Sequence, residues 1–556
     1  MDLSLTGYIL LVTTMMLVVL FPFPKITGIV FKLFTGFLLL IFSTLLFVDM
    51  ELYRHWGFRI DTTPFLYLGS PSAAMASMPV LRSLMLLLLA LLFVASFMWL
   101  FEKWLLRYPF QKVRWYKIPV FLLVALLMII PVRGGVGLAP MNPGKVYFSN
   151  NIFCNHAALN VVWNFLYNAS KAGEMYKKYP QYVSEENAES FFANLRESAD
   201  SAFVPSILTT SRPNVVVILL ESFTSKAIST LGGMEEVTPG FNKLAEEGLL
   251  FTRLYASGGR SDKGLVAVLS GFPAQSTQSV IKHTEKASRL PSLSRIFHQL
   301  SYNNTFYYGG DLDFANMRSY LVNGNYHNFI TRDDFPASYR NSKWGVHDEY
   351  VFQKLLDDLD HATSPYFKFL FTLSSHEPYD IPEEPRFAPT SEENMFLSSM
   401  AYTDKWLGWF FEQAKQRDWY ENTLFVLIAD HGHRFPANLS RHLAENYRIP
   451  MLWLGGALQQ QGRIETLGSQ TDLAATLLYQ LGLDNSSFMF SRNLLAPQSY
   501  PFAYYAFTDG FGFVSHDDLF IWDHQGQRSI MEPRRIETRQ NGFSWFQYYH
   551  NYYLGF

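Results

Sequence analysis

The chain has 556 residues and a formal net charge of −3, which leaves room for a group of membrane spans and one large domain. The near-neutral charge, without a long basic run, argues against nucleic acid as a partner. Aromatic residues make up 17%, which suits both membrane interfaces and a large buried core. Cys154 is the only cysteine, so the chain has neither an intramolecular disulfide framework nor a CxxC metal site.

Four apolar stretches precede residue 135, at about residues 7–22, 26–48, 81–101 and 116–132. Each approaches the roughly 20 residues that are needed to cross a hydrocarbon core. Residues 84–93 read LMLLLLALLF and are apolar all round, which favours membrane spans over buried core helices. The first stretch lacks a basic n-region and a small-residue cleavage site, so we do not interpret it as a signal peptide.

Basic residues in the connections predict the orientation of these spans. The connection after the third stretch is expected to be cytoplasmic because it holds Lys103, Arg107, Lys112, Arg114 and Lys117. The connection at residues 49–80 holds only Arg54 and Arg59 and is expected to lie outside. We therefore expect a multi-pass protein of the bacterial inner membrane, with everything after about residue 135 extracytoplasmic.

The same alternation puts Met1 outside, which is unusual for a chain that has no basic residue before Lys25. A first span missing upstream would explain this placement. An in-frame apolar segment upstream would support that hypothesis, and its absence would refute it.

Short apolar runs alternate with amphipathic segments from about residue 213 onward. Predicted strands cover residues 214–220, 251–256, 305–308, 367–373, 423–429 and 449–455, and predicted helices cover 240–248 and 471–481. Continuous apolar runs indicate strands buried on both faces, in a mainly parallel sheet flanked by helices. We expect a transmembrane anchor at residues 1–134, a juxtamembrane connector at 135–204 and an extracytoplasmic α/β domain at 205–556.

Four of these strands lead directly into polar residues. They run into Glu221, Asp311, Ser374-Ser375-His376 and Asp430-His431. Any one of these could be a solvated strand end, but chemistry in α/β sheets gathers at the carboxyl ends of strands. Glu, Asp and His suit a divalent cation such as Mn²⁺, Zn²⁺ or Mg²⁺. Such an ion would lower the pKa of a nucleophile and neutralise charge on a phosphoryl group.

A glycine-rich turn supplies a candidate nucleophile. Residues 258–264 read GGRSDKG and bring Ser261 to the start of a helix predicted over residues 265–270. A helix N-terminus there would bind an anion through its free amide groups. Considered alone, Ser261 could equally be an ordinary helix N-cap.

These motifs resemble one family. NVVVILLESF at residues 214–223, GGRSDKG at 258–264, HEPY at 376–379, ADHGH at 429–433 and TDLAATLL at 471–478 resemble the lipoteichoic acid synthase-like branch of the sulfatase/alkaline phosphatase superfamily. The resemblance covers roughly residues 205–490. It implies an N-terminal helical transmembrane bundle followed by an alkaline phosphatase/sulfatase-like domain with a mainly parallel sheet. It also implies transfer of glycerol phosphate or phosphoethanolamine from a membrane phospholipid to a glycan or lipid acceptor.

The resemblance gives Glu221, Asp430 and His431 the role of metal ligands. Ser261 takes the place of the nucleophile, which also contacts the metal and forms a covalent phospho-enzyme. His376 matches a histidine that contacts the substrate phosphate or the leaving group. We expect one divalent ion, with Mn²⁺ as first choice and Zn²⁺ or Mg²⁺ as alternatives.

Further residues are candidates for substrate binding. Asp311 and Arg318 look like the family's substrate-contacting pair. Arg260 and Lys263 could hold phosphate oxygens, although bases beside a turn are often simply exposed. His433 follows the metal pair and could line the site.

The chain also departs from the family pattern. The usual nucleophile is threonine, whereas this chain has Ser261, whose hydroxyl can do the same chemistry. Gly309 and Asn316 stand where lipoteichoic acid synthases carry a histidine and a tryptophan, so the headgroup stays open. The sulfatase signature of Pro and Arg two and four residues after the nucleophile is absent, so sulfate ester hydrolysis is not expected. Two alternatives remain: a non-catalytic lipid-binding envelope regulator, and a phosphodiesterase or phosphatase with water as acceptor.

Overall fold

The computed structural model describes residues 1–20, 22–56, 59–60, 80–104, 107, 114–137, 139–149, 152–175, 177–200, 204–498 and 500–555. The chain divides into two compact units, Met1–Glu174 and Met175–Phe556. Most of the connection predicted to lie outside, and Lys112 of the connection predicted to be cytoplasmic, fall outside the described residues. The boundaries of the expected connector at 135–204 stay a prediction.

The described part of the first unit contains four helices that are long and apolar enough to cross a membrane, as the sequence predicted. They are α1 (Asp2–Leu20), α2 (Pro24–Trp56), α5 (Val80–Trp104) and a fourth built from η2 (Trp115–Lys117), α6 (Ile118–Leu127) and α7 (Ile129–Arg133). Helix α1 packs against α6 and α7, and α2 packs against α5. The unit continues with η3 (Pro143–Val146), α8 (Ile152–Ala158) and α9 (Val161–Met175).

A nine-stranded sheet forms the centre of the second unit. Its strands are β1 (Asn214–Leu220), β2 (Leu249–Tyr255), β3 (Asn303–Tyr308), β4 (Asn328–Ile330), β5 (Tyr366–Phe371), β6 (Thr423–Ala429), β7 (Arg448–Leu454), β8 (Gly462–Ile464) and β9 (Gly468–Ser469). Their order is β4-β3-β5-β1-β6-β7-β2-β8, with β9 also paired to β2. Only β7 is antiparallel to its neighbours, so the prediction of a mainly parallel sheet is confirmed.

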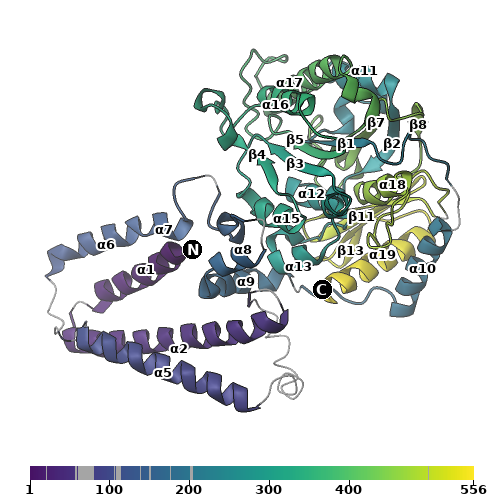
Figure 1. The fold of residues 1–556 in the computed structure, drawn as a ribbon. Helices are drawn as coiled ribbons and strands as arrows, with labels where there is room; N and C mark the ends of the chain where they lie inside the picture. Colours follow the sequence, from purple (N-terminus) through teal and green to yellow (C-terminus); the bar gives the residue numbers. More distant parts are fainter. Residues whose placement is uncertain are drawn as a thin grey trace. The chain divides into compact units, whose positions relative to one another are not determined.

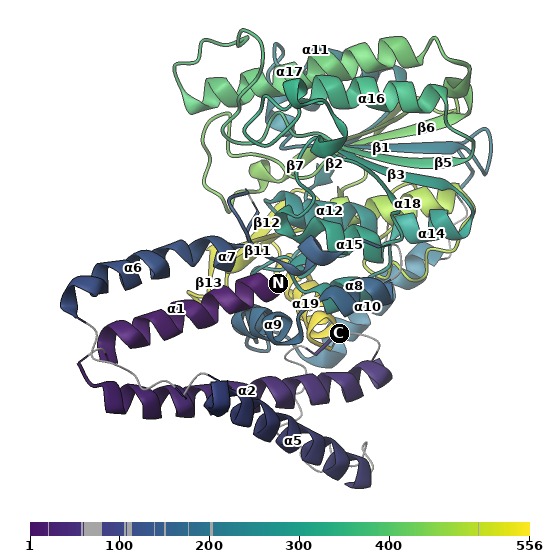
Figure 2. The same cartoon turned by 60° about the vertical axis from the view of Figure 1, so that its left-hand side comes forward.

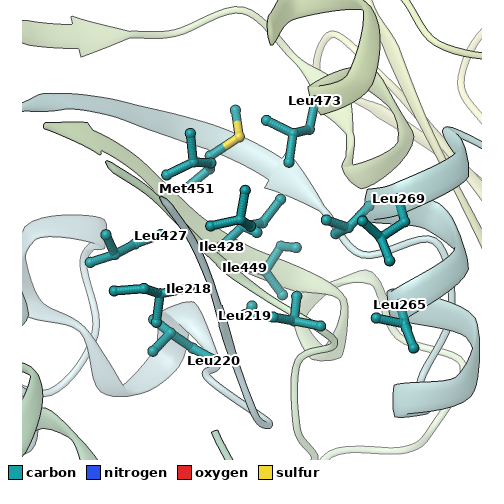
Figure 3. Close-up of a cluster of buried hydrophobic side chains, with 14 of the residues drawn as sticks. Ile218, Leu219, Leu220, Leu265, Leu269, Leu427, Ile428, Ile449, Met451 and Leu473 are labelled. Carbon is teal, nitrogen blue, oxygen red and sulfur yellow. The ribbon is translucent and has the colours of Figure 1, made fainter. Parts of the chain in front are cut away.

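Helices cover both faces of this sheet (Figures 1 and 2). One face carries α11 (Pro239–Glu247), α16 (Asp348–Asp360) and α17 (Glu392–Ala414), and the other carries α12 (Ser261–Ser270), α14 (Leu293–Gln299), α15 (Met317–Asn323) and α18 (Leu473–Gln480). All residues of β1 and β6 are buried, which explains their uninterrupted apolar sequences. Figure 3 shows Leu265 and Leu269 of α12 in the hydrophobic cluster that β1, β6 and β7 form beneath that helix.

A second, antiparallel sheet follows at the end of the chain. It contains β10 (Phe502–Phe507), β11 (Gly510–Ser515), β12 (Asp518–Asp523) and β13 (Arg528–Met531) in that order. Helix α19 (Ile536–Gly555) packs on β11 and β12, and α10 (Glu185–Asp200) packs on α19. The short helix α13 (Thr284–Arg289) completes the α-helices of the described part. Gly258 bridges to Ala506 of β10, so this sheet begins beside the turn that carries Ser261.

Candidate metal centre

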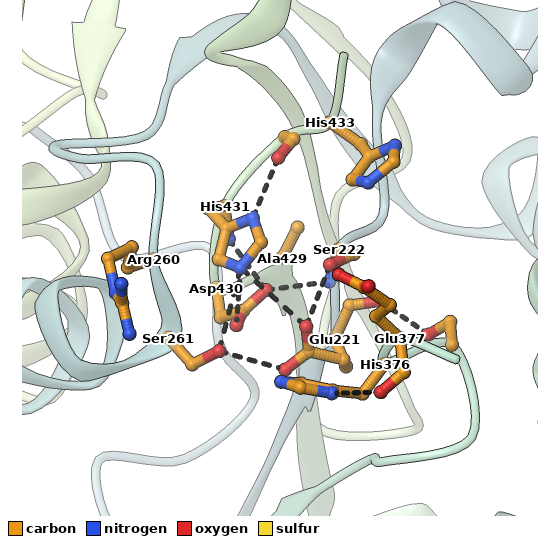
Figure 4. A network of polar contacts seen from close by, with 12 residues as sticks. Glu221, Ser222, Arg260, Ser261, His376, Glu377, Ala429, Asp430, His431 and His433 are labelled. Atoms are coloured by element: carbon orange, nitrogen blue, oxygen red, sulfur yellow. Dashed lines mark hydrogen bonds and ion pairs between the residues drawn. The ribbon is translucent and has the colours of Figure 1, made fainter. Parts of the chain in front are cut away.

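Glu221, Asp430 and His431 meet at the carboxyl ends of two neighbouring strands (Figure 4). Strands β1 and β6 pair in parallel with Leu220 opposite Ala429, so the residues that follow both strands emerge side by side. One potential ligand atom from each lies within 4.8 Å of the others. His431 Nε2 is 3.6 Å from Glu221 Oε1 and 3.5 Å from Asp430 Oδ2. The structure therefore brings together the three residues that the sequence named as ligands.

Ser261 is the first residue of α12 and faces this cluster. Its hydroxyl donates a hydrogen bond to Glu221 Oε2 at 3.0 Å and lies 3.5 Å from His431 Nε2. Arg260, and not Ser261, occupies the N-cap position of the helix. The interpretation of Ser261 as an ordinary N-cap is therefore wrong: its hydroxyl contacts the candidate ligands instead of capping the helix.

A glycine allows the helix to approach the end of β6 this closely. A Cβ atom on Gly264 would lie 2.0 Å from the carbonyl oxygen of Asp430, a distance that no side chain tolerates. The first turn of α12 consequently rests on the backbone of a candidate metal ligand. This contact fixes the distance between Ser261 and the carboxylates.

Hydrogen-bonding groups that the sequence analysis missed hold the ligands in place. Ser222 adopts a left-handed conformation, with φ of 57°, that directs both its polar groups to the cluster. Its hydroxyl donates to Glu221 Oε1 and its N–H donates to Asp430 Oδ1, both at 2.7 Å. Thr372 accepts from the Glu221 N–H at 2.8 Å, and the Gln470 amide donates to the Asp430 carbonyl at 2.7 Å. Of these residues, only Ser222 could have been predicted to bond the candidate ligands, because it directly follows Glu221 in the sequence.

The donor atoms fit a divalent cation. His431 Nδ1 lies 2.7 Å from the Gly432 carbonyl, which can only accept, so Nδ1 is the donor there and Nε2 is the ring nitrogen that faces the cluster. Asp430 Oδ2 is buried without a hydrogen-bond partner among the described residues. Burial, and then the charge of Glu221, raise the pKa of Asp430 well above its usual range. A bound cation would satisfy Asp430 Oδ2 and offset the repulsion between the two carboxylates.

Comparison with known proteins identifies the domain that carries this cluster. The family model for sulfatases matches residues 213–483. The likeness to sulfatases thus falls within the second unit, on the part of the chain that holds the central sheet. All three candidate ligands and Ser261 lie within the matched range.

Two similar proteins indicate which branch of the superfamily this chain resembles. The lipoteichoic acid synthase-like protein YvgJ of Bacillus subtilis (strain 168) is 23% identical over 315 residues, which cover 52% of this chain and 51% of YvgJ. Phosphoglycerol transferase I of Xanthomonas campestris pv. campestris is 26% identical over 321 residues, which cover 54% and 45% of the two chains. The chain thus spans about half the length of the curated relatives it matches. These relatives confirm the resemblance to the lipoteichoic acid synthase-like branch.

A solved structure supports the fold. A protein in the alkaline phosphatase superfamily from Vibrio parahaemolyticus superposes with a TM-score of 0.57 and 26% identity. The match covers 69% of this chain and 99% of that one. The predicted alkaline phosphatase/sulfatase-like fold is therefore confirmed.

His376 lies beside the three candidate metal ligands (Figure 4). Its Nδ1 is 2.9 Å from the Glu377 carbonyl, so Nδ1 is the donor there and Nε2 is the ring nitrogen outside this bond. Burial alone would raise the pKa of Glu221, but the charges of His376 and His431 and the hydrogen bond from Ser222 together lower it.

Trp344 fixes the orientation of His376. Its indole N–H donates to the same Glu377 carbonyl at 2.6 Å, and its ring lies edge-on to the imidazole with 4.5 Å between ring centroids. Trp344 belongs to the segment before α16, far from His376 in sequence, so no local motif links the two residues.

The predicted substrate-contacting residues Asp311 and Arg318 do not pair with each other. Asp311 follows β3 and pairs with Arg332 at 3.1 Å, whereas Arg318 pairs with Asp313 at 2.7 Å. Both ion pairs are partly exposed to solvent. Each arginine thus already has a carboxylate partner in the protein.

Three further candidates differ in how accessible they are. The Arg260 side chain is 68% exposed beside Ser261 and can reach a substrate. Lys263 is buried and donates to the Gln275 carbonyl at 2.5 Å, and burial lowers its pKa to about 8. His433 accepts from the Phe435 N–H and contacts the Tyr379 hydroxyl, both at 3.2 Å, and burial lowers its pKa to about 3. The polar groups of Lys263 and His433 are therefore engaged by the protein.

We expect metal affinity to rise with pH. The raised pKa of Asp430 means that a proton competes with the cation, and this competition weakens as pH increases through that pKa. Isothermal titration of the metal-stripped protein with Mn²⁺, in buffers of different ionisation enthalpy, would detect the released proton. The Asp430→Asn variant should lose both the affinity and the proton release. A pH-independent affinity without proton release would contradict this assignment.

We expect Trp344→Phe and Trp344→Ala to lower kcat while metal content stays at the wild-type level. The phenylalanine variant keeps the ring contact but loses the N–H donor, so it should fall between the wild type and the alanine variant, which we expect to lose about tenfold to a hundredfold. The pH profile of kcat on a soluble chromogenic phosphodiester should also shift, because His376 is less fixed. Unchanged kcat and pH profile in both variants would show that Trp344 does not position His376.

Proposed function

We propose that this chain is a membrane-anchored, metal-dependent phosphotransferase that moves a phosphate-linked headgroup from a phospholipid to a cell-envelope acceptor. The observation that supports it most is the contact of the Ser261 hydroxyl with Glu221 Oε2, at 3.0 Å, inside a carboxylate–histidine cluster. The names of the relatives favour glycerol phosphate over phosphoethanolamine as the headgroup.

The first half-reaction forms a covalent Ser261 intermediate. Ser261 Oγ attacks the phosphorus of the donor, the bond from phosphorus to the diacylglycerol oxygen breaks, and His376 Nε2 provides the proton for the leaving oxygen. Glu221 Oε2 accepts the hydrogen bond of the hydroxyl before attack. A cation held by Glu221, Asp430, His431 and Ser261 would lower the pKa of the Ser261 hydroxyl, so that its proton leaves to water before attack, and would neutralise charge on the phosphoryl oxygens.

The second half-reaction releases the headgroup to the acceptor. An acceptor hydroxyl attacks the phosphorus, His376 Nε2 takes its proton, and the bond from phosphorus to Ser261 Oγ breaks. The N-terminus of α12 favours the negative charge of the phosphoryl group throughout. The exposed guanidinium of Arg260 is available to the same oxygens.

The location follows from the anchor and its flanking charges. Four helices able to cross a membrane tether the domain to the bilayer in which a lipid donor resides. Lys103, Arg107, Arg114 and Lys117 favour a cytoplasmic connection after the third span, which makes the sulfatase domain extracytoplasmic in the bacterial inner membrane.

Two other functions remain distinguishable by experiment. A lipid-binding regulator has no need of a serine hydroxyl in contact with a metal-binding cluster, so the Ser261 contact argues for catalysis. A phosphodiesterase or phosphatase would share the first half-reaction and differ only in using water as the acceptor.

The full-length protein with Mn²⁺ and phosphatidylglycerol or phosphatidylethanolamine should acquire a covalent adduct, because Ser261 retains the headgroup until an acceptor arrives. Intact-mass measurement would detect the adduct and identify the headgroup from the added mass. Ser261→Ala should lose the adduct and about a thousandfold or more of the turnover, while Ser261→Thr, which keeps a hydroxyl, should retain both. A chelator should abolish the adduct of the wild type.

Turnover by Ser261→Ala at the wild-type rate would contradict the covalent mechanism. Stoichiometric metal without an adduct or turnover on either lipid would contradict the proposed donors. Release of free headgroup without transfer to any envelope acceptor would favour the phosphodiesterase.

A further inference from the structure

A surface rich in both arginine and exposed apolar side chains lies at the outer edge of the second sheet. We call residues 528–539 the edge surface. Ile530, Met531 and Ile536 are exposed there, and Ile536 at 77% is by far the most exposed of them. The arginines of the same segment, which are also exposed, are Arg528, Arg534, Arg535 and Arg539.

The backbone holds this segment in place. Strand β13 pairs with β12 alone and forms the edge of its sheet. The carboxylate of Asp518 accepts the N–H groups of Arg534 and Arg535 at 2.8 and 3.0 Å. On the arginine side these bonds use backbone N–H groups only, so they hold the turn between β13 and α19 without engaging the two guanidinium groups.

The edge surface carries an excess of positive charge. Its acidic residues are Glu532 and Glu537, and Glu532 pairs with Arg539 at 3.4 Å. Arg528, Arg534 and Arg535 form no ion pair with other described residues of the chain. The segment thus has three arginines without an ion-pair partner among the described residues, next in sequence to apolar side chains that the fold leaves in water.

We propose that the edge surface docks onto the headgroup region of an anionic lipid bilayer. Exposed apolar side chains interleaved with arginines are typical of segments that lie in a membrane interface, where the apolar groups enter the acyl boundary and the arginines bind lipid phosphates. The bilayer is the partner that the chain always has within reach, because four helices able to cross it belong to the same protein.

Docking would bring the turn that carries Ser261 close to the bilayer, where a lipid substrate resides. Gly258, three residues before Ser261, bridges to β10, and β13 is the third strand beyond β10 in the same sheet. With four spacings of about 4.8 Å between paired segments, β13 lies about 19 Å from the nucleophile turn. Only this consequence rests on the proposed function; the docking itself needs no catalysis.

A fluorescent probe on Ile536 tests the proposal in the full-length chain. Cys154 is the only cysteine, so a Cys154→Ser, Ile536→Cys variant takes a single environment-sensitive dye. The labelled protein is placed in nanodiscs of phosphatidylcholine, with or without phosphatidylserine, which supplies negative charge without being a proposed donor. Met234→Cys is the matched control, since Met234 is 37% exposed but is followed by Glu235 and Glu236.

In discs with phosphatidylserine, the emission maximum of the dye at position 536 should move to shorter wavelength, and lipid-attached quenchers should quench it. High salt should reduce this quenching, because it screens the attraction between the arginines and the lipid. The double substitution Arg534→Gln, Arg535→Gln should weaken the quenching at position 536. The dye at position 234 should show neither the wavelength shift nor the quenching. Absence of lipid quenching at position 536 would overturn the proposal. A shift that persists in detergent and grows with protein concentration would also overturn it, because the occupant would then be a second copy of the chain.

Discussion

The candidate site depends on one close backbone approach, in which the first turn of α12 rests on the carbonyl of Asp430. Gly264 makes this possible, since any Cβ atom would collide with that carbonyl at 2.0 Å. Because the helix is held there, the Ser261 hydroxyl lies 3.0 Å from Glu221 instead of capping its own helix. The same contact aims the positive end of the helix dipole at the place where a phosphoryl group would sit.

Two carboxylates buried side by side are costly, and the surrounding residues indicate how the protein offsets that cost. Ser222 donates to both carboxylates, and His431 Nε2 faces them at 3.6 and 3.5 Å while its Nδ1–H is bonded to the Gly432 carbonyl. Asp430 Oδ2 still has no hydrogen-bond partner among the described residues. A divalent cation would bind Asp430 Oδ2 and offset the repulsion between the carboxylates, which links the electrostatics of the site to its proposed chemistry.

The sequence was informative where a residue's role follows from its place on a buried strand. Uninterrupted apolar runs located β1 and β6, and the residues directly after them are the candidate ligands. Trp344 and Gln470 could not be found in this way, because their contacts depend on segments distant in the chain. The ion pair of Arg318 with Asp313 could not be predicted either, because the resemblance assigned Asp311 and Arg318 to substrate contacts and said nothing of their partners in the protein. The strands β10 to β13 were not predicted individually.

The most direct test of the account compares Gly264→Ala with Gly259→Ala, two glycines of the same turn. A Cβ on Gly259 would meet Tyr447 at an ordinary 3.6 Å, so that variant is the matched control. The measurement is the yield of phosphorylated Ser261 per folded chain, with folding checked by circular dichroism. The account predicts that Gly259→Ala keeps the wild-type yield and that Gly264→Ala loses it, because the helix must move away from Asp430. A wild-type yield in Gly264→Ala would contradict the claim that this contact positions the nucleophile.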